Sequence, residues 1–376
     1  MQTELAVPES ERELCDLLRD LAGVPASTEA GGAVAAGPVV TGSAAPEPAA
    51  VRAGFGGSCP DLEGAGSVVI STSRLADVVS FRPRDLTIEV GAGTRMKDLV
   101  QFVQEQNLWL PASGPGLERS VGGWISASSP DAWDACFGPV RRQLLGCRMA
   151  TPSGQLLSWG RAVMKNVAGY DMPRLMAGSR GRLGIMTTIT LRLWPRPPVI
   201  SAHEIAGSEP GDLLEWTGAD AVAWQWSRQS RERQTVVFAG GAESVHRRRN
   251  ALGDRAGSNA HGVVSVWPPR TAESVVYRLT PGRRYLPATF AALTRTAEPS
   301  LAAIEAWPAT GTMLVQFDAG QQPDLPRPEM ITAVERGGPG THERVTALRD
   351  PAISSIERKI ERVFGAWPRS WLADYL

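Results

Sequence analysis

The stretch VMKNVAGYDMPRLMAGSRGRLGI, residues Val163 to Ile185, places a short apolar helix between two glycine-bearing ends. Its second half contains Gly178, Gly181 and Gly184, and a run of β-branched residues follows it directly. Glycine permits a positive φ and a close approach of the backbone to a ligand, so that successive N–H groups can face an anion. The stretch is therefore either a set of ordinary turns or a main-chain surface for a bound molecule.

Three more glycine clusters precede this stretch, and each borders a short apolar run. They are Arg52–Ser58, Pro111–Gly123 and Gly138–Gly146. A single Gly-Gly pair usually marks a plain turn, but four clusters interleaved with short strands indicate one extended ligand site. None of them matches the dinucleotide fingerprint GxGxxG or the phosphate loop GxxxxGK[ST]. A Rossmann domain and a P-loop domain are excluded by the residues themselves.

The spacing of apolar residues predicts the elements around these clusters. Ser10 and Glu13 form a capping-box pattern before a helix over residues 11–21. The tract 22–50 consists almost entirely of Ala, Gly, Pro, Ser and Thr. Such a composition cannot bury enough apolar area to offset its ordering entropy, so we predict a mobile loop there.

The rest of the first half alternates predicted strands with glycine-rich loops. Strands are expected over 68–70, 86–90, 109–110, 147–149, 156–159 and 185–193, with a helix from Thr94 to Asn107. Residues up to Gly123 are expected to form a loop in which Gly122 and Gly123 adopt a positive φ and lie against the ligand. Pro195, Pro197 and Pro198 mark a domain boundary.

Beyond residue 198 the composition changes to short strand-like pieces and arginine-rich turns. Strands are expected over 236–238, 263–266 and 313–317, a long loop over 321–341, and a helix over 354–364. This pattern is typical of an antiparallel sheet with helices on one face. We therefore predict an α+β fold with a first domain over residues 1–198 and a smaller domain over residues 199–376.

Charge and composition exclude several classes of function. The 376 residues carry 39 basic and 39 acidic side chains, which argues against nucleic acid as the main partner. The sequence shows neither a signal peptide nor a membrane span, so we expect a cytoplasmic protein, with any contact to the inner face of the membrane made through partners. The cysteines and histidines lie singly, without the spacing of metal ligands, so no metal site is predicted.

The order of the segments resembles the FAD-binding domain of the vanillyl-alcohol-oxidase superfamily, the PCMH-type flavoproteins. The matching motifs are Ile88–Thr94 (IEVGAGT), Val121–Gly123 (VGG) and Gly178–Ile185 (GSRGRLGI). The opening stretch is more specific, because Val163–Asp171 (VMKNVAGYD) with the residues that follow is similar to the FAD-binding subunit of bacterial glycolate oxidase. The resemblance covers residues 5–198 well and the remainder loosely.

The resemblance implies a two-lobed domain with FAD extended between the lobes, followed by an α+β cap domain. It assigns to FAD the residues Gly54, Gly56, Gly57, Ser58, Pro111, Val121, Gly122, Gly123, Gly138, Gly181, Gly184 and Ile185. No histidine precedes His203, so histidyl attachment is excluded in the first domain and FAD is expected to bind non-covalently. The motif residues Lys165, Asn166, Tyr170 and Asp171 match the subunit, but their role stays open between helix capping and a flavin or interface role.

The function that the resemblance implies is that of an FAD-binding subunit in a glycolate oxidase-type complex, acting on small 2-hydroxy acids. A sister flavin subunit and an iron–sulfur subunit are the implied partners. The residues themselves suggest no catalytic base. Where relatives read G-x-V-R-D-x-V-L-G, Gly138–Gly146 of this chain reads GPVRRQLLG and lacks the aspartate, and its first glycine cluster reads AGFGGS. These departures favour an alternative, a non-catalytic structural subunit with a decayed flavin site. A stand-alone FAD-dependent alcohol oxidase is the third hypothesis.

Overall fold

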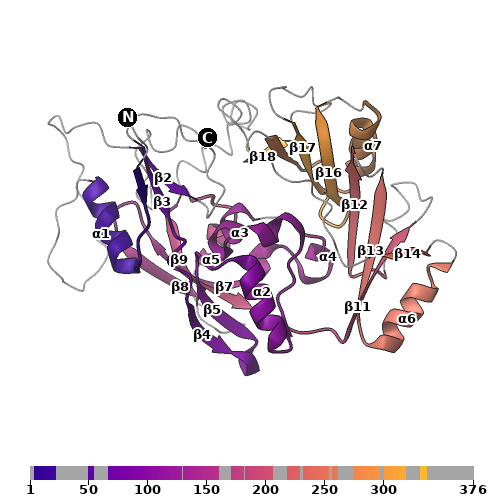
Figure 1. Ribbon diagram of the computed structural model, residues 1–376, viewed down its shortest axis with the longest axis horizontal. Coiled ribbons are helices and arrows are strands. Elements are labelled where there is room, and N and C mark those ends of the chain that lie inside the picture. The colour runs from indigo at the N-terminus through magenta and orange to yellow at the C-terminus, as the bar shows by residue number, and fades with distance from the viewer. Residues whose placement is uncertain are drawn as a thin grey trace.

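The computed structural model describes two regions of regular structure joined near residue 198 (Figure 1). The described residues are 4–22, 50–54, 67–128, 130–160, 171–181, 183–205, 218–228, 232–253, 256–260, 275–296, 300–318 and 331–336. Within them no helix has the length and apolar character needed to cross a membrane. The combination of antiparallel sheets with packed helices confirms the predicted α+β class.

The first lobe is a small parallel sheet with one helix. It contains β1 (Glu4–Ala6), α1 (Glu11–Ala22), β2 (Ala50–Gly54) and β3 (Ser67–Ser71), with β3 between the other two strands. The hydroxyl of Ser10 caps α1 by accepting from the N–H of Glu13 at 3.2 Å, as predicted. The Glu13 carboxylate accepts from the N–H of Glu9 at 2.8 Å, so both partners stabilise the helix start.

The second lobe is a five-stranded antiparallel sheet in the order β4-β5-β9-β7-β8, together with a two-stranded pair β10-β6. Its elements are β4 (Val78–Arg82), β5 (Thr87–Gly91), α2 (Met96–Glu105), β6 (Leu108–Trp109), α3 (Val121–Ala127), α4 (Asp134–Phe137), β7 (Leu144–Ala150), β8 (Leu156–Gly160), α5 (Met172–Met176), β9 (Ile185–Arg192) and β10 (Trp194–Pro195). Helices α2, α3 and α5 bury Leu99, Trp124 and Met176 against one face of the sheet. This face forms the main core of the first domain.

The cap is an eight-stranded antiparallel sheet in the order β14-β11-β13-β12-β16-β17-β15-β18. Its elements are β11 (Val199–Ile205), β12 (Ala221–Ser227), β13 (Arg233–Gly240), α6 (Ala242–Asn250), β14 (Ala256–Ala260), β15 (Val275–Leu279), α7 (Leu286–Thr296), β16 (Leu301–Trp307), β17 (Thr312–Phe317) and β18 (Ile331–Arg336). One face buries Trp224 and Phe238 together with Val245 of α6 and Phe290 of α7. Helices on one face were the expectation from the sequence.

The other face of the cap sheet packs on the first domain. Ala221 and Trp307 of the cap share an apolar cluster with Trp109 and Trp133 of the first domain. The rings of Trp109 and Trp133 meet edge to face, with their centroids 4.7 Å apart. The two domains therefore meet through an apolar, packed junction.

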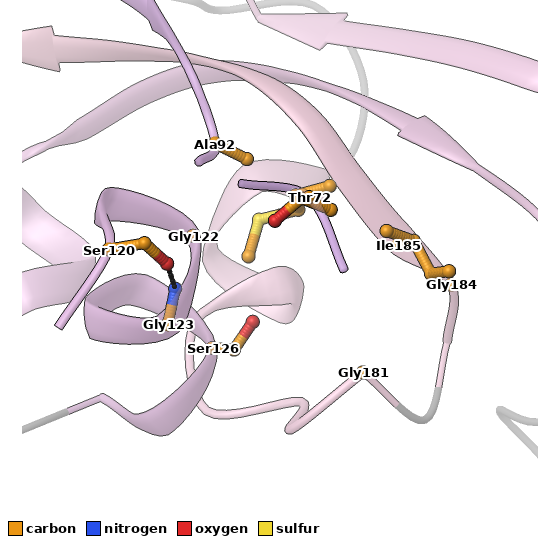
Figure 2. A pocket seen from close by; sticks show the side chains of 10 residues that line it. Thr72, Ala92, Ser120, Gly122, Gly123, Ser126, Gly181, Gly184 and Ile185 are labelled. Carbon is orange, nitrogen blue, oxygen red and sulfur yellow. Dashed lines mark hydrogen bonds between the residues drawn. The ribbon is translucent and has the colours of Figure 1, made fainter. Parts of the chain in front are cut away.

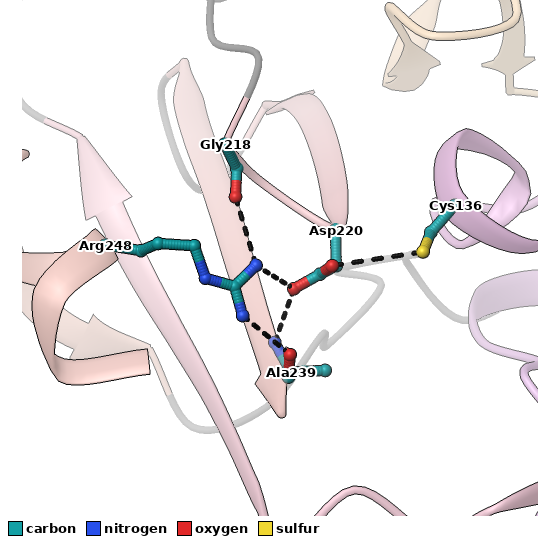
Figure 3. A network of polar contacts seen from close by, with 5 residues as sticks. All are labelled: Cys136, Gly218, Asp220, Ala239 and Arg248. Carbon is teal, nitrogen blue, oxygen red and sulfur yellow. Dashed lines mark hydrogen bonds and ion pairs between the residues drawn. The ribbon is translucent and has the colours of Figure 1, made fainter. Parts of the chain in front are cut away.

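A polar network closes this junction at one side (Figure 3). The Asp220 carboxylate accepts from Arg248 of α6 at 2.7 Å and from the N–H of Ala239 at 2.6 Å. Its second oxygen lies 3.9 Å from the thiol sulfur of Cys136 on α4. Asp220 thus links two cap elements with the first domain.

Two sequence expectations are wrong. Residues 121–127 form the helix α3 rather than a loop, because Val121, Trp124 and Ile125 are fully buried against the core. The expected loop over 321–341 contains β18, which pairs antiparallel with β15 at the sheet edge. The predicted strand 263–266, the predicted helix 354–364 and residues 23–49 of the predicted mobile tract lie outside the described residues.

We expect Gly93→Ala to destabilise the chain by about 2–3 kcal/mol, the range for overpacking a tight site. A Cβ at Gly93 would fall on the carbonyl oxygen of Thr72, so the turn after β5 would have to move away from the turn after β3. Gly218→Ala is the matched control, since no atom lies within 4 Å of its added Cβ. Urea unfolding measures both variants, and equal midpoints would contradict this account of the turn.

Candidate functional site

A pocket lies where the first lobe meets the second (Figure 2). It opens to solvent and receives residues from the turns after β3 and β5, from α3, and from the segment entering β9. The lining residues are Thr72, Ala92, Ser120, Gly122, Gly123, Ser126, Gly181, Gly184, Ile185 and Met186. Most of them are small and none is ionisable, so this wall presents backbone and hydroxyl groups to a ligand.

The N-terminal end of α3 is tied to the turn after β5. The hydroxyl of Ser120 caps the helix by accepting from the N–H of Gly123 at 3.1 Å. The N–H of Gly122 donates to the carbonyl of Ala92 at 2.8 Å, and a Cβ on Gly122 would lie 3.0 Å from the Ala92 Cβ. The positive φ expected for Gly122 and Gly123 is wrong, because both lie in the helix. Glycine is needed at Gly122 for close packing.

The C-terminal carbonyls of α3 are satisfied from two other segments. The N–H groups of Gly178 and Arg180 donate to the carbonyls of Ile125 and Ser126, each at 3.0 Å. The next carbonyl, that of Ala127, accepts from the guanidinium of Arg278 at 2.8 Å, and Arg278 belongs to the cap strand β15. Helix α3 is therefore held by both domains.

The segment from Gly178 to Gly184 has the unusual backbone that its glycines suggested. Gly178, Gly181 and Gly184 have φ values of 87°, 78° and 149°. A Cβ on Gly184 would also lie 2.5 Å from the carbonyl oxygen of Ala150, so this position has no room for a side chain. Between these glycines the hydroxyl of Ser179 is buried and has no hydrogen-bond partner among the described residues. Such an orphaned group is typical of a site completed by a ligand.

The structure brings together part of the sequence-predicted set. Gly122, Gly123, Gly181, Gly184 and Ile185 line the pocket, although they come from two motifs far apart in sequence. Gly54 ends β2 opposite Ser71, the residue before the pocket-lining Thr72. Gly56, Gly57 and Ser58 lie outside the described residues.

Three predicted residues do not line this pocket. Pro111 is buried between β6 and the turn that follows it, and Val121 packs into the main core. Gly138 ends α4 with a φ of 75°. Thr72, Ala92, Ser120, Ser126 and Met186 also line the pocket, and sequence reasoning missed them because they are common residue types whose place depends on the fold.

Of the motif residues whose role stayed open, only Asp171 lies in the described part of the chain. It occupies the N-cap position of α5, but its side chain makes no capping hydrogen bond. Its carboxylate pairs instead with Arg174 in the first turn, at 2.7 Å. Lys165, Asn166 and Tyr170 lie outside the described residues.

Two acids, the buried Asp131 and the partly buried Asp134, lie at the start of α4. The Asp131 carboxylate accepts from the hydroxyl of Ser113 at 2.7 Å and from the N–H of Trp133 at 3.0 Å. Asp134 accepts from the N–H of Asp131 at 3.2 Å. Asp131 thus links the segment after β6 to the start of α4.

Burial raises the pKa of Asp131 above its usual range. The pKa of Asp134 is raised to about 8, first by burial and then by the negative charge of Asp131. The hydrogen bond from the Asp131 N–H and the positive charges of Arg278 and Arg141 oppose this shift. At neutral pH Asp134 is therefore mostly protonated.

We expect Asp134→Asn to leave stability unchanged near pH 4 and to stabilise the chain at pH 8, by at most about 6 kcal/mol, since each pH unit between the two pKa values is worth about 1.4 kcal/mol. Because the folded-state pKa is raised, the folded chain keeps a proton that the unfolded chain has lost above its usual pKa of 3.8. Wild-type stability therefore falls as the pH rises toward about 8. Thermal unfolding between these pH values measures the difference. Asp20→Asn, on the exposed side of α1, is the control.

Comparison with known proteins agrees with this architecture. A family model described as an FAD binding domain matches residues 44–160. Glycolate oxidase subunit GlcE of Escherichia coli is 37% identical over 144 residues, which cover 37% of this chain and 41% of that protein. D-2-hydroxyglutarate dehydrogenase of Xanthomonas citri is 34% identical over 152 residues, 40% of this chain and 32% of that protein. The aligned region thus spans less than half of either relative.

A solved structure of alkyldihydroxyacetonephosphate synthase shares the fold. It superposes with a TM-score of 0.60 over 96% of this chain and 74% of that one, at 12% sequence identity. The family match, the relatives and this shared architecture lead to one conclusion. Residues 44–160 match an FAD binding domain, which makes FAD the cofactor, and the chain is similar to glycolate oxidase subunits.

Proposed function

We propose that this chain is the FAD-binding subunit of a glycolate oxidase-type complex that oxidises small 2-hydroxy acids. The observation that carries the proposal is the pocket at the meeting of the two lobes, where two glycine motifs converge. The similarity to glycolate oxidase subunit GlcE supports the choice within the family. A cytoplasmic location and a sister flavin subunit with an iron–sulfur subunit as partners belong to the same proposal.

The residues of the pocket fit FAD. An extended ligand with a planar ring needs a wall without large side chains, and Gly122, Gly123 and Gly181 provide one. A diphosphate requires that no carboxylate face it, and no acidic side chain lines the pocket. The buried hydroxyl of Ser179 lies in the adjoining glycine segment and has a hydrogen bond to give.

The chain's own residues would hold and shield the cofactor. Gly122, Gly123, Gly181 and Gly184 would present backbone to it, and the hydroxyls of Ser126 and Thr72 would donate or accept hydrogen bonds at the rim. Ile185 and Met186 would exclude water from the apolar part of the pocket. When bound, FAD supplies an acceptor for the hydride of a 2-hydroxy acid.

A second candidate function is that of a structural subunit that binds flavin without oxidising substrate. The residue types that line the same pocket favour it. Oxidation of a hydroxy acid needs a base for the hydroxyl proton. The lining of the described pocket contains no histidine, carboxylate or lysine. In this reading a partner subunit carries out the oxidation, and this chain passes electrons or supports the complex.

We expect the purified chain to contain FAD that acid or heat releases, and Thr72→Trp to reduce the retained amount at least about tenfold. An indole at Thr72 would occupy the pocket. The steric clash would weaken the free energy of FAD binding by more than about 1 kcal/mol. Ser73→Trp is the matched control, because the next residue is exposed and does not line the pocket. Flavin absorbance per protein measures both. Equal flavin content in the two variants would show that FAD binds elsewhere.

We also expect the isolated chain to show no glycolate- or lactate-dependent reduction of an artificial dye, since the described pocket lacks a base. Co-expression with the partner subunits should restore activity. Robust turnover by the isolated chain would sink the subunit proposal and favour a stand-alone alcohol oxidase. The flavin content of each preparation is measured in parallel, so that loss of FAD is not mistaken for lack of chemistry.

A further inference from the structure

The contact between Arg278 and helix α3 joins the cap to the FAD pocket. Arg278 lies on β15, opposite Leu314 of β17, on the sheet face that packs against the first domain. Its guanidinium donates to the carbonyl of Ala127, the last residue of α3, at 2.8 Å. A cation at this end of a helix also interacts favourably with the helix dipole.

The same helix supplies the wall of the pocket. Gly122, Gly123 and Ser126 of α3 line the pocket, and all seven residues of α3 are buried. The seven residues of α3 make about two helical turns, and because all of them are packed in the core the helix moves as one body. A displacement at Ala127 would therefore move the pocket wall.

We infer that Arg278 is a positioning residue of the cap that holds α3, and with it the wall of the FAD pocket, in the binding geometry. The inference rests on the proposed role of this pocket in FAD binding. It means that the cap contributes to cofactor retention without lining the cofactor site. A weaker contact between the cap and α3 would then increase the rate of FAD release.

The charges around this contact come from three segments. Arg278 and Arg141 of the turn before β7 both lie close enough to Asp134 of α4 to lower its pKa, and Asp131 lies beside Asp134. The hydrogen bond from Arg278 to the Ala127 carbonyl at 2.8 Å ties this group of charges to the end of α3.

The test compares Arg278→Gln, Arg278→Lys and a matched control, Arg228→Gln. Arg228 lies at the end of β12 in the same sheet, but it pairs with Asp318 at 2.8 Å and donates to the carbonyl of Leu301 at 3.0 Å, both within the cap. Two quantities are measured on the full chain. The first is hydrogen exchange of residues 121–128 without FAD, and the second is the rate of FAD release from the loaded chain, followed by flavin fluorescence.

We expect Arg278→Gln to speed exchange in residues 121–128 and FAD release by about tenfold, the effect of losing one charge-assisted hydrogen bond. Arg278→Lys keeps the charge and should restore a large part of both. Arg228→Gln should change neither. If Arg278→Gln behaves like Arg228→Gln, or if it lowers the urea midpoint of the whole chain without any selective effect on residues 121–128, the inference is overturned.

The two readouts separate this inference from the proposed function. A wild-type chain that never retains FAD would contradict the proposed function, while exchange in the flavin-free chain would still decide whether Arg278 holds α3. A chain that retains FAD, but whose FAD release rate is the same in Arg278→Gln as in Arg228→Gln, would contradict only the positioning role. Insolubility of Arg278→Gln leaves Arg278→Lys, which should show both effects in weaker form.

Discussion

The architecture depends on satisfying the two ends of one fully buried seven-residue helix, α3. A helix leaves its first N–H groups and its last carbonyls without partners inside the helix, and burial makes each of them costly if it stays unpaired. In this chain the turn after β5 accepts from the first N–H groups, and Gly178, Arg180 and Arg278 donate to the last carbonyls. Segments more than 150 positions apart in sequence must therefore meet at α3.

This constraint explains why the glycines are where they are. Gly122 lets the helix touch Ala92, and Gly184 lets the chain pass the carbonyl of Ala150. Both are close contacts within the second lobe, so a side chain at either position would push the contacting segments apart. The pocket is the space left between these contacts, and for that reason its wall consists of small residues.

Much of the fold and of the pocket could be predicted from the sequence, but helix α3 and several pocket residues could not. The glycine clusters located two walls of the pocket, and apolar spacing located α1, α2 and most strands, because both signals are local. Helix α3 was missed because Gly-Gly has low helix propensity, and only burial of Trp124 and Ile125 in the tertiary core outweighs that. Thr72 and Ser126 carry no local signal, since the crossing of the lobes alone makes them pocket residues. The edge strand β18 was missed for the same reason, because its partner β15 lies more than 50 positions earlier.

The ionisable residues lie away from the pocket, so the residues that would bind FAD differ from those that could transfer a proton. The described wall of the pocket is neutral, whereas Asp131 and Asp134 lie after α3, where Asp131 binds Ser113 and Asp134 lies near Arg278 of the cap. The pKa of Asp134 is raised to about 8, and the Asp131 carboxyl group already accepts from three donors on the protein itself. Both acids therefore have a structural role in this segment. A subunit of this kind can retain a flavin while a partner supplies the base. The lack of a base in its pocket follows from where its ionisable residues lie, and the fold itself is kept.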